Sequence, residues 1–89
     1  MQLANTTAIV TGAASGLGAA TAHALAAGGA RVTGLDLQQS IEGASPIDGV
    51  TLVATDVTDE TQVRAAVEQA NSDAAAPLRI VVNCAGIGP

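Results

Sequence analysis

Three glycines, at positions 12, 16 and 18, stand between a β-branched segment at residues 6–10 and an alanine-rich segment that follows them. This order predicts a buried strand, a tight turn and the start of a helix. Because glycine has no Cβ atom, the backbone at these positions can turn sharply and approach a ligand closely. The first N–H groups of the following helix have no partner within the helix. Such a turn can hold a phosphate, and the pyrophosphate of a dinucleotide is the candidate ligand.

Asp36 follows the second predicted strand, 24 residues after Gly12 and 18 after Gly18. Dinucleotide-binding proteins place an acid about 20 residues beyond the glycine turn, where it accepts a hydrogen bond from a ribose 2′-hydroxyl. An ionised carboxylate also repels a 2′-phosphate, which favours NAD over NADP. The alternative is a carboxylate that caps a loop. Because the glycine turn precedes it, we favour ribose binding.

Three further positions have both a functional and a structural interpretation. Asp56, which Val57 follows, either contributes to binding or simply forms a turn before a helix. Cys84 has no adjacent basic residue, so a small buried side chain is favoured over a reactive thiol. His23 lies off the predicted apolar face of the first helix, which favours a solvated residue over a general base. No metal site is predicted.

Hydrophobic patterns assign the elements that must position these residues. Strands are predicted at residues 6–10, 30–35, 51–54 and 79–82, and helices at residues 16–27 and 59–75. The segment 38–50 is predicted to be a loop with at most one turn of helix. This alternation predicts an α/β fold, the amino-terminal part of a doubly wound parallel sheet with the strand order 3-2-1-4.

Each predicted helix has an expected face. In the first helix, the apolar face is expected at Leu17, Ala20, Thr21, Ala24 and Leu25. In the second, it is expected at Val63, Ala66, Val67 and Ala70. The spacing of Glu60, Arg64 and Glu68 predicts two weak ion pairs. Either Thr58 or Asp59 is expected to cap the second helix.

Composition limits the classes of function. The 89 residues are too few for a complete dinucleotide-binding domain, so residues 1–89 are predicted to form part of one that a downstream half would complete. The net charge is −5, with three arginines and no lysine, which predicts no nucleic-acid partner. The single cysteine and the lack of a long apolar segment predict a soluble, cytoplasmic protein with no membrane partner.

Taken together, these residues resemble a known family. The segments Thr11-Gly12-x-x-x-Gly16-x-Gly18, Asp36, Asp56-Val57 and Asn83-x-Ala-Gly86 have the order and spacing of the amino-terminal half of a short-chain dehydrogenase/reductase. The resemblance covers essentially the whole chain. It implies a Rossmann domain that binds NAD and belongs to an oxidoreductase acting on a hydroxyl or a carbonyl.

The resemblance also implies roles for single residues. The turn that contacts the pyrophosphate and ribose would comprise Gly12, Ser15, Leu17 and Gly18. Asp36 would bind the adenosine ribose hydroxyls. Asp56 and Val57 would lie beside the adenine ring, with the Asp56 carboxylate facing its amino group. The backbone at Asn83 and Cys84 would lie beside the cofactor ribose, and Gly86 would allow a close approach.

The catalytic residues of the family have no match in this sequence. Its members use a tyrosine, a lysine and a serine, whereas this chain has no tyrosine or lysine and no serine in a matching position. We therefore assign no catalytic residue and expect no turnover by these 89 residues alone. A non-catalytic, stand-alone dinucleotide-binding module is the alternative to part of an enzyme.

The substrate is less defined than the cofactor. Cysteine stands at position 84 where the family usually has asparagine. Three segments together are similar to type 2 3-hydroxyacyl-CoA dehydrogenases: Asn-Cys-Ala-Gly-Ile at 83–87, Ser-Gly-Leu-Gly-Ala-Ala-Thr-Ala at 15–22 and Leu-Asp-Leu at 35–37. Reductases of 3-oxoacyl groups and dehydrogenases of steroids or sugar alcohols remain alternatives. The resemblance implies a small-molecule substrate and a complete protein that is a homo-oligomer.

Overall fold

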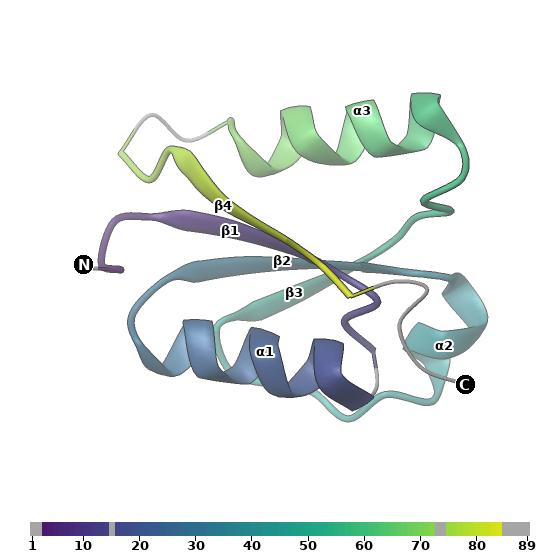
Figure 1. The fold of residues 1–89 in the computed structure, drawn as a ribbon, viewed down its shortest axis with the longest axis horizontal. Helices are drawn as coiled ribbons and strands as arrows, with labels where there is room; N and C mark the ends of the chain where they lie inside the picture. The colour runs from purple at the N-terminus through teal and green to yellow at the C-terminus, as the bar shows by residue number, and fades with distance from the viewer. Residues whose placement is uncertain (1–2, 15, 73–74, 85–89) are drawn as a thin grey trace.

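The four strands form one parallel sheet in the predicted order, β3-β2-β1-β4. The structure is a computed structural model that describes residues 3–14, 16–72 and 75–84. Its elements are β1 (Thr7–Thr11), α1 (Gly16–Ala27), β2 (Arg31–Asp36), α2 (Gln38–Glu42), β3 (Val50–Ala54), α3 (Glu60–Ala70) and β4 (Leu78–Asn83). Figure 1 shows α1 and α3 on opposite faces of the sheet, with α2 beyond the end of β2.

Strand β1 is the centre of the core because helices cover both of its faces. Ala8 and Val10 are fully buried and pack in the cluster that contains Ala22 of α1. Ile9, whose side chain points to the other face, packs with Leu35 and with Ala66 of α3. This alternation follows from the period of two along a strand. The parallel sheet is thus buried on both faces at β1, whereas β3 and β4 at its edges are only partly buried.

The predicted face of α1 is wrong in part, because Leu25 packs against the core and Thr21 is partly buried, but the other three predicted residues are exposed. The buried residues of the helix are Gly18 and Ala22, four residues apart, whereas Leu17 is 60% exposed and Ala20 and Ala24 are exposed. The helix is apolar on nearly all sides, so the spacing of its apolar residues does not indicate which side faces the sheet. A close approach of Gly18 to the preceding turn determines which side faces the sheet.

The apolar stripe of α3 is confirmed. Ala66 is buried, and Val63, Val67 and Ala70 are partly buried beside the sheet. Of the two predicted ion pairs, Arg64 forms the one with Glu60, with its Nη2 3.1 Å from Oε1. Within the described residues, Arg64 makes no ion pair with Glu68. Both partners of the formed pair are exposed, so its contribution to stability is small.

Helix α3 ends at Ala70, five residues before the predicted end at Ala75. Asn71 stands at the C-cap position, and its side-chain Oδ1 accepts a hydrogen bond from the Leu78 N–H at 2.9 Å. This contact bridges seven residues and brings the chain into β4. The alanines at 74–76 favour a helix locally, but the side chain of Asn71 is used to close the connection instead.

The segment after β2 largely matches its prediction. Helix α2 has five residues, little more than one turn, and the rest of residues 38–49 forms no further helix. Each strand bound differs from its predicted position by at most one residue. Within the described residues, no helix is long and apolar enough to cross a membrane.

Asp59 is the N-cap of α3, and its Oδ1 accepts hydrogen bonds from the backbone N–H groups of Thr61 at 3.0 Å and Gln62 at 3.3 Å. We expect Asp59→Ala to lower the free energy of unfolding by about 1 kcal/mol, as loss of an N-cap does. Urea denaturation of the complete protein would measure the change. Glu68→Ala, an exposed residue of the same helix, is the control and should change little. An unchanged unfolding free energy in Asp59→Ala would contradict the capping role.

Candidate cofactor site

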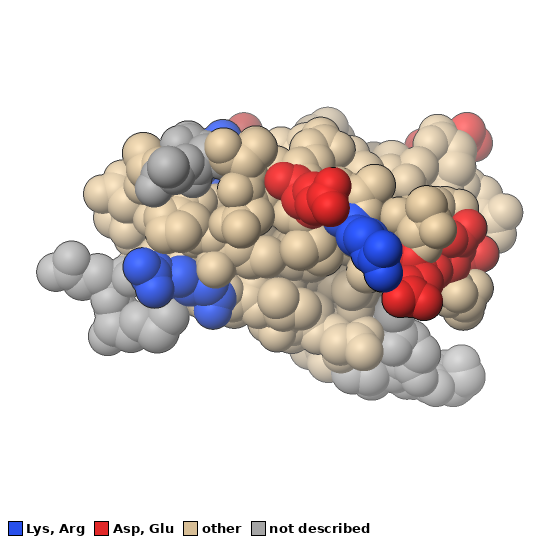
Figure 2. Space-filling model, turned by 90° about the horizontal axis from the view of Figure 1, so that it is seen from above, with Lys and Arg blue, Asp and Glu red and all other residues tan. Residues whose placement is uncertain are grey.

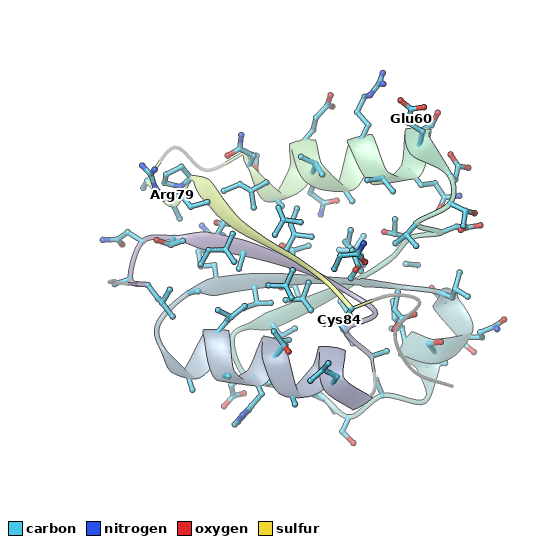
Figure 3. The ribbon with its side chains drawn as sticks, viewed as in Figure 1. Glu60, Arg79 and Cys84 are labelled. Atoms are coloured by element: carbon cyan, nitrogen blue, oxygen red, sulfur yellow. The ribbon has the colours of Figure 1, made fainter. Side chains whose placement is uncertain are left out.

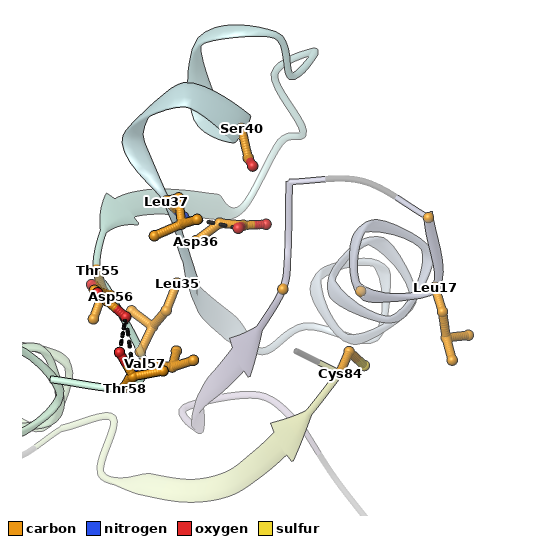
Figure 4. A pocket seen from close by; sticks show the side chains of 13 residues that line it. Leu17, Leu35, Asp36, Leu37, Ser40, Thr55, Asp56, Val57, Thr58 and Cys84 are labelled. Atoms are coloured by element: carbon orange, nitrogen blue, oxygen red, sulfur yellow. Dashed lines mark hydrogen bonds between the residues drawn. The ribbon is translucent and has the colours of Figure 1, made fainter. Parts of the chain in front are cut away.

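The carboxyl ends of the strands border a hollow of about 440 Å³. Figure 4 shows the hollow between the glycine turn after β1, the segment after β2 and the segment after β3. It is lined by these sequence-predicted residues: Gly12, Leu17, Gly18, Asp36, Asp56, Val57 and Cys84. Residues that are distant in sequence therefore meet at one place. Open parallel sheets bind ligands at this edge.

The glycine turn adopts a backbone that other residues rarely adopt. Gly12 has φ 67° and Gly16 has φ 60°, both in the left-handed region. A Cβ atom on Gly18 would lie 1.9 Å from the carbonyl oxygen of Gly12, so the helix starts directly against the turn. A Cβ on Gly16 would meet nothing within 4 Å. The turn is therefore closely packed on the Gly18 side and open at Gly16, which fits a bound phosphate.

Asp36 holds the two segments on either side of the hollow. Its Oδ2 accepts a hydrogen bond from the Ala14 N–H in the glycine turn at 3.0 Å, and its Oδ1 accepts one from the Leu37 N–H at 2.8 Å. Asp36 thus also has the loop-capping role that the sequence left as the alternative. Each carboxylate oxygen can accept more than one hydrogen bond, so capping and binding of ribose hydroxyls are compatible.

Asp56 follows β3 and faces the same hollow. Its Oδ1 accepts hydrogen bonds from the Thr58 hydroxyl at 2.6 Å and the Thr58 N–H at 2.9 Å (Figure 4). Both hydrogen bonds lower the pKa of the Asp56 carboxyl below its ordinary value, the bond from the Thr58 hydroxyl more than the bond from the Thr58 N–H. The lowered pKa favours the ionised form of Asp56, which accepts hydrogen bonds at both oxygens and donates none.

Thr11 joins the ends of β1 and β4. Its Oγ1 donates a hydrogen bond to Asn83 Oδ1 at 2.6 Å and accepts one from the Cys84 N–H at 3.0 Å. The Asn83 side chain is thus bound to Thr11, and Asn83 does not line the hollow. Cys84 is buried and does line it, in agreement with the small buried side chain predicted. Ser15 and Gly86 lie outside the described residues.

Sequence reasoning missed several lining residues. These are Leu35, Leu37, Ser40, Thr55 and Thr58. Leu35 and Thr55 are buried supports at the ends of strands. For Thr58 a signal was present, because an Asp two residues before a Thr favours a local turn closed by the side chain. The other residues lie at the hollow because the assembled sheet brings their segments together, and local sequence patterns do not predict this.

The charge of the hollow is negative, with Asp36 and Asp56 and no arginine among its lining residues. Figure 3 places Arg79 at one end of β4 and Cys84 beyond the other, so this arginine lies far from the hollow. On the face that carries α3, the described arginines lie apart from one another (Figure 2). A phosphate in the hollow would therefore depend on backbone N–H groups of the turn and of α1.

Comparisons with known proteins agree with this geometry. A family model described as short chain dehydrogenase matches residues 6–89. The chain is 47% identical to the 3-hydroxyacyl-CoA dehydrogenase type-2 of Drosophila melanogaster, covering 92% of the chain and 33% of that protein. It is 43% identical to glycine betaine reductase ATRR of Emericella nidulans, covering 96% of the chain and 7% of that protein.

A solved structure of a dehydrogenase/reductase is also similar to this chain. The short-chain type dehydrogenase/reductase from Mycobacterium ulcerans matches with a TM-score of 0.82 and 28% identity, covering 100% of this chain and 35% of that one. The chain thus spans about a third or less of the length of these relatives.

Proposed function

This chain belongs to the short-chain dehydrogenase family, and we propose that its 89 residues form the cofactor-binding part of an NAD-dependent oxidoreductase. The main support for this proposal is the hollow, which both the glycine turn and the Asp36 carboxylate line. A dinucleotide needs both a cradle for its pyrophosphate and an acceptor for its ribose hydroxyls. When bound, NAD would accept a hydride from a hydroxyl-bearing carbon, or NADH would return one to a carbonyl.

The residues of the hollow suit the parts of NAD. The backbone of the glycine turn would approach the pyrophosphate and the adjacent ribose closely and bind them; the residues are Gly12, Ser15, Leu17 and Gly18. The open space beside Gly16 and the N-terminus of α1 support this role. The backbone at Asn83 and Cys84 would lie beside the cofactor ribose, and Gly86 would allow a close approach.

The adenosine half would lie between the segments that follow β2 and β3. Asp36 would accept hydrogen bonds from the ribose hydroxyls and repel a 2′-phosphate. Asp56 and Val57 would lie beside the adenine. Support comes from the position of both carboxylates on the same hollow and from the ionised state of Asp56 that its lowered pKa indicates.

For the substrate we propose a 3-hydroxyacyl-CoA. This rests on the Asn-Cys-Ala-Gly-Ile segment and on the relative whose name contains that substrate. The tyrosine, lysine and serine that exchange the proton with substrate would come from sequence beyond these residues. We further propose that the complete protein is cytoplasmic, which the single cysteine and the lack of a long apolar segment favour. We also propose that it forms a homo-oligomer, as the resemblance implies.

Titration of the complete protein with both cofactors tests the proposal. We expect NAD to bind more tightly than NADP, and Asp36→Ala to reduce that preference by about tenfold or more, the size expected for hydrogen bonds to a charged group. Asp48→Ala removes an exposed carboxylate remote from the hollow and should leave the preference unchanged. Equal or tighter binding of NADP to the unaltered protein would refute the assignment of NAD.

A further inference from the structure

The two oxygens of the Asp56 carboxylate have different surroundings. Oδ1 accepts both hydrogen bonds from Thr58, one from its hydroxyl and one from its N–H. Within the described residues, Oδ2 has no hydrogen-bond partner. Because Thr58 fixes one oxygen with two donors, rotation of the carboxylate is restricted. The other oxygen is left for a donor that comes from the hollow.

The main chain at Asp56 is fixed by a second residue, Gln62 in the first turn of α3. Gln62 Oε1 accepts a hydrogen bond from the Asp56 N–H at 2.9 Å, and Gln62 Nε2 donates one to Asp59 Oδ2 at 3.1 Å. In a capping box, a residue at this position of a helix bonds to the N–H of the N-cap residue itself. Here the side chain passes beyond the N-cap Asp59 to Asp56, three residues earlier.

A role in helix capping alone does not account for both contacts. Asp59 already accepts hydrogen bonds from the N–H groups of Thr61 and Gln62, so α3 is capped without the bond to Asp56. The Gln62 amide orients α3 and Asp56 relative to each other because it binds both at once. Side chains that act on a binding group in this way determine its geometry without touching the ligand.

We propose that Thr58 and Gln62 are positioning residues that hold Asp56 Oδ2 ready to accept a hydrogen bond from the amino group of the cofactor's adenine. This rests on the proposed function, in which Asp56 lies beside that ring. The pair would give the site its preference for adenine over a base that carries a carbonyl in place of the amino group. A carbonyl oxygen facing Oδ2 places two acceptors together and is disfavoured.

The test compares binding of NAD with that of its deaminated analogue, nicotinamide hypoxanthine dinucleotide, to the complete protein by calorimetric titration. The ratio of the two dissociation constants reports the adenine preference. We expect a preference of about tenfold in the unaltered protein, the size of one hydrogen bond to a charged group. Thr58→Val and Gln62→Met should each bring the ratio close to one, as should Asp56→Ala, whereas Thr58→Ser should retain the preference.

Ala66→Gly is the matched control, because it weakens α3 from its buried face without altering Thr58 or Gln62. Its ratio should stay high although its melting temperature falls. The proposal is overturned if the ratio persists in Thr58→Val and Gln62→Met while Asp56→Ala abolishes it, and the proposed function then stands. It is also overturned if Ala66→Gly loses the preference for NAD over its deaminated analogue as fully as Thr58→Val and Gln62→Met do. If the unaltered protein binds both dinucleotides equally, Asp56 makes no contact with the adenine amino group and the proposal is overturned. If the protein does not bind NAD at all, the proposed function is wrong as well.

Discussion

Gly18→Ala is expected to abolish measurable NAD binding, with a loss of affinity greater than about a hundredfold. The added Cβ would lie 1.9 Å from the carbonyl oxygen of Gly12 and 2.6 Å from its carbonyl carbon. Both atoms belong to the backbone, so no side chain can move aside. The start of α1 must shift away from the turn, and the N–H groups that would hold the pyrophosphate shift with it. We also expect a loss of about 1–3 kcal/mol in unfolding free energy, as in other overpacked sites.

Gly43→Ala is the control for this substitution. Gly43 has φ −90°, and a Cβ there would have its nearest contact, Ser40 O, at 3.9 Å. The substitution should change neither stability nor affinity by a measurable amount. Thermal unfolding and titration with NAD would be measured on both variants of the complete protein. If Gly18→Ala binds NAD as the unaltered protein does, the close packing of turn and helix is not needed for the cofactor.

Much of the fold could be predicted because its signals are local. The glycine turn, the β-branched strands and the stripe of α3 each depend on neighbouring residues, and the parallel order follows from general rules of connection. The face of α1 could not be predicted, because its alanines make all sides similarly apolar. It is determined by contact of Gly18 with Gly12. The end of α3 depends on the bond between Asn71 and Leu78, which local helix preference does not include.

The candidate site shows the same limit. The spacing from the glycine turn identified Asp36, and the family resemblance identified Asp56. The structure brings both to one hollow. The sequence did not identify Gln62, whose role requires a side chain to pass its own helix cap. Nor did it indicate that Thr11 would bind the Asn83 side chain across 72 residues. Contacts of this kind follow from the assembled sheet and not from any spacing.

A polypeptide of these 89 residues alone is expected to self-associate and to unfold without a cooperative transition. Strand β4 lies at the edge of the sheet, and within the described residues it pairs with β1 alone. Val81 in this strand is 65% exposed and Leu17 is 60% exposed. An unpaired strand edge with apolar side chains favours pairing with another chain, and exposed apolar surface costs about 25 cal/mol per Å².

The net charge of −5 opposes this association but does not remove the exposed surface. Size-exclusion chromatography with light scattering would give the mass in solution, and circular dichroism on heating would show whether the transition is cooperative. Val81→Lys places a charge on the edge strand and should reduce the associated fraction. A monodisperse monomer that melts cooperatively would show that these residues fold independently. In that case, a self-sufficient dinucleotide-binding module would be favoured over part of a larger oxidoreductase.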